Sequence, residues 1–139
     1  MLRKNLSRAV ALAAVAGSLA VGTASAHHSF AAYDMSKTQT AAGTIKEFRW
    51  GAPHSSMVLT YKDKSGKAGS MSILTGSPLT FSRQGFTARD FRRGDAVTVV
   101  YHPNVSGQPG GAMSSLTLKD GRKYSDGEAS GVSGGAPSP

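Results

Sequence analysis

Apolar and polar residues alternate along much of the chain between residues 44 and 118. A pattern with period two is typical of half-buried β-strands. The alternation is clearest at Met57, Leu59 and Tyr61, and it resumes at Met71 and Ile73 after the turn-forming residues 63–67. Two alternating runs on either side of such a turn predict a β-hairpin. We therefore expect a mainly β protein.

Three further runs complete the predicted sheet. Residues 44–50 are strand-like, but the apolar phase slips between Ile45 and Phe48, so we expect a β-bulge near Lys46 and Glu47. Apolar residues alternate again at positions 97, 99 and 101 and at positions 116 and 118, each run lying beside turn-forming residues. The pattern predicts five strands.

One short helix interrupts these strands. Ser77 is a suitable N-cap, Pro78 suits the first helical position, and Gly85 suits the residue after the last turn. The helix falls between the third and fourth strands, which is the element order of an OB-fold, a small five-stranded Greek-key barrel. A sandwich of two packed sheets is the alternative, but sandwiches usually contain about seven strands, more than this pattern provides.

The first 26 residues have the organisation of a secretory signal peptide, with a basic head, an apolar run over residues 9–20 and small residues at 24–26. The apolar run is shorter than the roughly 20 residues that span a bilayer. We therefore expect cleavage after Ala26 and a mature periplasmic protein without a transmembrane segment. We divide the mature chain into a leader (residues 27–39), an OB-like barrel domain (residues 40–124) and a disordered tail rich in Gly, Ser and Pro (residues 125–139).

Charge and cysteine content narrow the function classes. The chain has 16 Lys and Arg against 8 Asp and Glu, and loss of the three cations in residues 1–26 would lower the net charge from +8 to +5. The absence of Cys excludes disulfides and Cys-based zinc sites. Export would remove nucleic acid as a partner. Because we find no nucleophile elbow, phosphate loop or evident acid/base pair, we predict a protein that is not an enzyme.

Several short motifs together resemble a known family. They are Ala26-His27-His28-Ser29-Phe30, Phe48-Arg49-Trp50 followed by Pro53-His54-Ser55, Gly76-Ser77-Pro78, Gly94-Asp95-Ala96-Val97 and His102-Pro103. With these motifs, the chain resembles the domain-of-unknown-function family 6152, a family of small exported proteins of Gram-negative bacteria. The resemblance covers roughly residues 27–124 and implies a periplasmic, barrel-like module. It implies no reaction.

Four histidines are the candidate metal ligands, namely His27, His28, His54 and His102. Cleavage after Ala26 would make His27 the first residue, so that its α-amine and its imidazole can chelate one ion with His28 beside them. Such a nitrogen set favours Cu(II) among the divalent first-row ions. His54 is expected in the loop between the first two strands, and His102 is expected to open the loop between the fourth and fifth. These loops flank one face of an OB-fold, so all four histidines can converge on copper.

Two other interpretations use the same chain differently. In one, the barrel face binds an envelope protein, glycan or lipid, and the histidines are ordinary turn or core residues. In the other, the protein is a copper oxidase of polysaccharides that uses an N-terminal histidine, but the small size and the absent sandwich pattern argue against it. The prediction carried forward is a non-catalytic periplasmic module that binds copper.

Overall fold

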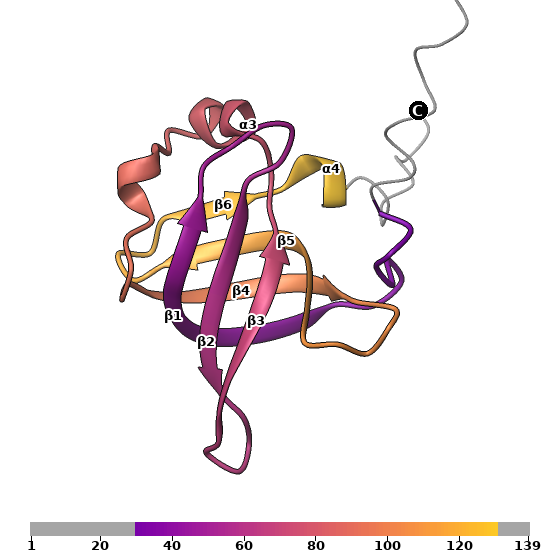
Figure 1. Cartoon of the computed structure of the whole chain (residues 1–139). Coiled ribbons are helices and arrows are strands. Elements are labelled where there is room, and N and C mark those ends of the chain that lie inside the picture. The colour runs from indigo at the N-terminus through magenta and orange to yellow at the C-terminus, as the bar shows by residue number, and fades with distance from the viewer. Residues whose placement is uncertain (1–29, 131–139) are drawn as a thin grey trace, which may run out of the picture. The chain divides into compact units, whose positions relative to one another are not determined.

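The computed structural model describes residues 30–130 of the chain (Figure 1). The predicted signal peptide, the predicted mature start at His27 and residues 131–139 of the predicted tail lie outside this range. The barrel described below belongs to the compact unit that begins at Ala32. Across residues 30–130, the helices are all too short or too polar to cross a bilayer.

Short strands and helices follow one another closely in the described residues. The strands are β1 (Gln39–Arg49), β2 (Ser56–Lys62), β3 (Ala68–Leu74), β4 (Ala96–Pro103), β5 (Gly110–Leu118) and β6 (Lys123–Ser125). Helix α3 (Pro78–Arg83) and the 3₁₀ helix η2 (Ala88–Asp90) lie between β3 and β4, and helix α4 (Gly127–Ser130) follows β6.

Strands β1 to β5 close into a mixed barrel. Antiparallel pairs join them in the order β3-β2-β1-β4-β5, and a short parallel pairing between β3 and β5 closes the ring. Strand β6 pairs antiparallel with the C-terminal part of β5, beyond the residues of β5 that pair with β3. Figure 1 shows α3 at one end of the barrel, beside the loop that joins β1 to β2. The prediction of a mainly β, five-stranded OB-like barrel with one short helix between strands 3 and 4 is confirmed, and the short β6 is an addition to it.

The predicted β-bulge is present in β1. The register of β1 against β2 shifts between Ile45 and Glu47, so that Lys46 is the extra residue. The insertion reverses the alternation, and both Ile45 and Phe48 can then pack on the interior core. The slipped apolar phase in the sequence is therefore the direct signature of this irregularity.

Helix α3 has the predicted caps. Ser77 Oγ accepts a hydrogen bond from the Thr80 N–H at 3.2 Å, and Gly85 follows the helix with a φ of +82°. Replacing Ser77 by Ala should lower the free energy of unfolding by about 1 kcal/mol, because the Thr80 N–H loses its acceptor. Urea denaturation measures the change. Leu79→Ala in the same helix is the control, since Leu79 is 58% exposed; equal losses in the two variants would contradict the capping role.

The barrel interior and the space under α3 share one core. Each barrel strand contributes at least one residue that is at most 1% exposed, for example Ile45, Leu59, Ile73, Val99 and Leu116. Phe81 of α3 is fully buried and stacks on Tyr124 of β6, with ring centroids 3.9 Å apart. Gly76 permits this packing, because a Cβ there would collide with Tyr124 Oη. The aromatic stack thus fixes both α3 and β6 to the end of the barrel.

The chain after Tyr124 differs from the predicted disordered tail. Ser125 belongs to β6, Asp126 is only 5% exposed, and Ala129 of α4 is fully buried. Gln84 holds this stretch, since its Nε2 donates to the Ser125 carbonyl and its Oε1 accepts from the Ser125 N–H. The small and polar composition of residues 125–130 gives no sign of these long-range contacts.

Candidate functional site

His102 is the best defined of the candidate ligands. It lies inside β4, one residue before the strand ends at Pro103, and it is 1% exposed. The prediction that it opens the loop between the fourth and fifth strands is wrong, because pairing with β5 continues through His102 and Pro103. Since successive side chains of a strand point to opposite faces and Tyr101 joins the interior core, His102 lies on the outer face of the barrel wall. It is nonetheless buried, so other segments cover it.

The described part of the leader contributes to this cover. From Ala32 onward, the leader runs antiparallel to the end of β4, upstream of the point where Gln39 begins β1. Tyr33 forms a β-bridge with Asn104, and the Asp34 N–H donates to the Pro103 carbonyl at 2.8 Å. The leader therefore lies directly against the strand that carries His102.

One contact with the leader orients the His102 ring. Nδ1 of His102 lies 2.7 Å from the backbone carbonyl oxygen of Lys37. Because a carbonyl oxygen only accepts, we assign the proton to Nδ1, which donates to Lys37. Nε2 of the neutral ring then carries a free lone pair, and within residues 30–130 this buried nitrogen has no hydrogen-bond partner. Sequence reasoning missed Lys37, because the contact uses a backbone group that every residue carries.

This arrangement is the one in which proteins present an imidazole to a metal ion. A metal-binding histidine commonly donates its second ring N–H to a backbone carbonyl or carboxylate, which fixes the tautomer and raises the basicity of the ligating nitrogen. A buried polar atom without a partner costs about 1–3 kcal/mol. A ligand bound to His102 Nε2 would remove a cost of this kind.

A row of paired strand residues links the segment that carries His54 to His102. As predicted, His54 is in the loop between β1 and β2, two residues before Ser56. The register pairs Ser56 with Leu74, Leu74 with Ala112, and Ala112 with His102, so these residues form one row across three strand gaps. At about 4.8 Å per gap, the row extends over about 14 Å along the curved wall. The two histidine-bearing segments are thus linked through β3 and β5, although on the other side of the barrel they adjoin opposite ends of β1.

The described residues do not form a complete metal site by themselves. Between residues 30 and 130, no three His, Cys, Asp or Glu side chains gather closely enough to hold an ion. His27 and His28 lie outside the described range, so the structure does not place them. Within residues 30–130, the structure thus shows one buried histidine with an unpartnered ring nitrogen, His102, and a second histidine, His54, in the loop between β1 and β2.

A charged turn in the leader precedes Lys37. Asp34 Oδ1 accepts hydrogen bonds from the N–H and the hydroxyl of Ser36, and Asp34 Oδ2 forms an ion pair with Lys37 Nζ at 2.8 Å. The hydrogen bonds from Lys37 and Ser36 lower the pKa of the Asp34 carboxyl from 3.8 to about 2. The turn that leads to the Lys37 carbonyl therefore keeps its charge pair at neutral pH.

The lowered pKa of Asp34 makes the leader turn sensitive to acid. Because the folded-state pKa lies below the ordinary one, the ionised carboxyl stabilises the turn above about pH 4, and this contribution is lost as the pH falls toward 2. We expect the Asp34 carboxyl carbon resonance to titrate with a midpoint near 2 in NMR spectra. Lys37→Ala should raise the midpoint, whereas Lys123→Ala on β6 should not; an ordinary midpoint in the unmodified protein would contradict the pairing.

Comparison with known protein families agrees with the resemblance in the sequence. The model of a family of unknown function, DUF6152, matches residues 14–114, which is well over half of the 139-residue chain. The matched range includes His54 and His102. No curated protein matches the chain. The chain therefore belongs to DUF6152, a family whose function is unknown.

Proposed function

We propose that the protein is a non-catalytic periplasmic module that binds copper through His27, His28, His54 and His102. The observation that carries this proposal is the buried, unpartnered Nε2 of His102, whose ring is oriented by the Lys37 carbonyl. In the neutral ring, such a nitrogen can bind a metal ion without breaking a hydrogen bond within residues 30–130.

The length of the leader allows the N-terminal histidines to reach His102. Ala32 accepts a hydrogen bond from the Val105 N–H at 2.9 Å, which anchors the leader near the end of β4. Val105 is three residues from His102, or about 10 Å along an extended chain. The five residues that separate His27 from Ala32 can span about 17 Å. The span of residues 27–32 thus exceeds the separation between Val105 and His102.

The chemistry of the donor set favours copper over the other divalent ions. Cleavage after Ala26 would place an amine and an imidazole on the same residue, His27, and the other ligands would also be imidazoles. Nitrogen ligands of this kind bind Cu(II) most tightly in the first-row series. Copper would displace the proton of the terminal amine and bind the neutral rings.

Titration of Cu(II) into the chain that begins at His27 tests this function. A variant with one Ala placed before His27 separates the amine from the His27 imidazole, and we expect its affinity to fall by at least tenfold. His54→Ala should also weaken binding, by about tenfold, if the loop histidine completes the set. An Ala added at the C-terminus is the matched control and should leave the affinity unchanged. Equal affinity for both N-terminal forms would exclude the terminal chelate.

A further inference from the structure

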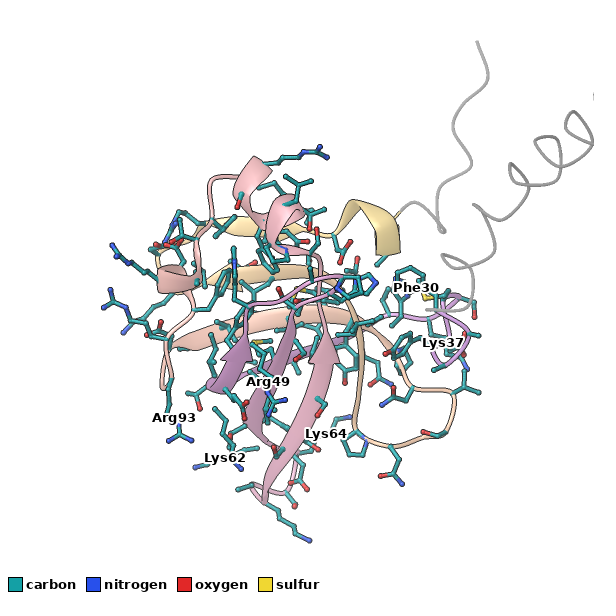
Figure 2. The ribbon with its side chains drawn as sticks, turned by 45° about the horizontal axis from the view of Figure 1, so that its top comes forward. Phe30, Lys37, Arg49, Lys62, Lys64 and Arg93 are labelled. Carbon is teal, nitrogen blue, oxygen red and sulfur yellow. The ribbon has the colours of Figure 1, made fainter. Side chains whose placement is uncertain are left out.

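The net positive charge of the described residues is concentrated on one wall of the barrel. We call this region the basic wall and define it by six cations on or beside β1, β2 and the β2–β3 turn, namely Lys46, Arg49, Lys62, Lys64, Lys67 and Arg93. Two carboxylates, Glu47 and Asp63, share the wall. The other residues from 30 to 130 contain seven cations and six carboxylates. The wall therefore has a net charge of +4, and the remaining described residues have a net charge of +1. Figure 2 shows Arg49, Lys62, Lys64 and Arg93 on the same side of the molecule.

The backbone geometry of the sheet gathers these cations. The bulge makes Lys46 an extra residue on the edge of β1, and the Arg93 Nε donates to the Lys46 carbonyl at 2.9 Å, which places a second cation there. Lys62 ends β2, and Lys64 and Lys67 occupy the turn that leads into β3. All five side chains belong to exposed residues.

The two carboxylates leave most of this charge uncompensated. Glu47 pairs with Arg49, with 2.6 Å between Glu47 Oε1 and the guanidinium Nε. Asp63 is used within the turn, where its Oδ1 accepts from the Ser65 N–H, the Ser65 hydroxyl and the Lys67 N–H. Among residues 30–130, the side-chain ammonium groups of Lys62, Lys64 and Lys67 form no ion pair.

The wall is an open, uncharged sheet surface between its cations. The outer faces of β2 and β3 carry the small side chains of Thr60, Ser70 and Ser72, together with the half-buried Val58 and Leu74. The exposed large apolar residues of the described chain, Leu79 and Val105, lie on other elements. The six cations lie outside three cavities of this unit, of about 410, 330 and 210 Å³. Cations spread over a sheet surface suit an extended anionic surface better than a small anion.

We propose that the basic wall adsorbs the protein to a bilayer that contains anionic phospholipid. Head-group phosphates present many negative charges in one plane. Each Lys or Arg near such a surface raises the affinity of a protein for the membrane about fivefold. Because the wall carries no exposed aromatic or large aliphatic side chain, the contact is electrostatic, reversible and weakened by salt. Insertion into the apolar layer is not part of it.

The cations of the wall are distinct from the four proposed copper ligands. Strand β2 begins at Ser56, close to His54, and ends at Lys62, so the lysine-rich turn lies at the opposite end of that strand from His54. Seven residues of strand correspond to about 23 Å. Membrane adsorption and copper binding can therefore be tested independently.

Co-sedimentation with lipid vesicles in low salt tests the proposal. The full mature chain should bind vesicles of phosphatidylcholine with about 30% phosphatidylglycerol, should not bind pure phosphatidylcholine, and should be released at about 0.5 M salt. The combined variant Lys62→Gln, Lys64→Gln and Lys67→Gln should lose about 100-fold in affinity. The matched control removes the same charge elsewhere, at Arg83, Arg89 and Lys123, each changed to Gln, and should lose far less.

Three outcomes would overturn the proposal. The first is an equal loss in the two triple variants, which would mean that net charge rather than the wall determines binding. The second is equal binding to neutral and anionic vesicles. The third is binding to a soluble polyanion such as polyphosphate without binding to vesicles, which would assign the wall to a different class of partner.

Discussion

Replacing Gly110 by Ala should lower the free energy of unfolding by about 3 kcal/mol or more. Gly110 has a φ of +115°, which L-residues rarely adopt, and an added Cβ would collide with the carbonyl oxygen of Ser72. Ser72 and Gly110 form the first of three residue pairs in the parallel β3–β5 pairing. The substitution therefore acts on the contact that closes the barrel.

A second glycine, Gly121, allows the cost of backbone strain to be distinguished from the cost of the steric collision. Gly121, in the turn between β5 and β6, has a φ of +90°, but an added Cβ there would meet nothing within 4 Å. Gly121→Ala should cost about 1 kcal/mol, from backbone conformation alone. Urea denaturation of both variants measures the difference. Comparable losses would show that the close approach of β3 to β5 contributes little to stability.

Replacing His102 by Asn should lower the affinity for Cu(II) by about 10- to 100-fold. The Asn side-chain amide can occupy the position of Nδ1 and donate to the Lys37 carbonyl, whereas nothing takes the place of Nε2. The substitution thus removes the proposed ligand while it keeps the contact with the leader. Cu(II) titration measures the affinity, and thermal unfolding of the metal-free variant verifies that the barrel is intact.

His102→Phe is the companion variant, because it keeps an aromatic ring but loses both nitrogens. We expect it to weaken copper binding as much as Asn does and also to loosen the leader, seen as faster amide exchange at Asp34 and Lys37. If copper binds the Asn variant as tightly as the unmodified protein, His102 is not a ligand. A folded Asn variant with a loosened leader would show that the Lys37 contact needs the imidazole itself.

The local features of the fold were predictable because their causes are local. A bulge shifts the side-chain phase by one residue, and the sequence records this shift between Ile45 and Phe48. Ser77 and Gly85 mark the ends of α3 because backbone groups within the same helix require them. The order of five strands and one helix followed from these same patterns.

Features that depend on distant segments were not predictable. Asp126 and Ala129 lie in a stretch of small and polar residues, and their burial results from the attachment of β6 to β5 and to Gln84. The burial of His102 likewise depends on the leader, 65 residues away along the chain at Lys37. No periodicity in the sequence links these segments.

Of the candidate residues, His54 lies in the predicted loop between the first two strands, whereas His102 lies in a strand and not in the expected loop. The tautomer of His102 could not be predicted, because it is set by the backbone carbonyl of Lys37, a group that every residue carries. The row of paired residues from Ser56 to His102 could not be predicted either. It depends on the parallel pairing of β3 with β5, which consists of three residue pairs.

Pulsed electron paramagnetic resonance of the chain that begins at His27, loaded with one equivalent of Cu(II), tests most directly whether His102 is a copper ligand. An imidazole bound through Nε2 gives a distinct modulation from its remote nitrogen, Nδ1. We predict a signal from several imidazoles, which loses one contribution in His102→Asn. The control variant with one Ala added at the C-terminus should give the same signal as the unmodified protein. An identical modulation in the unmodified protein and in His102→Asn would contradict the assignment.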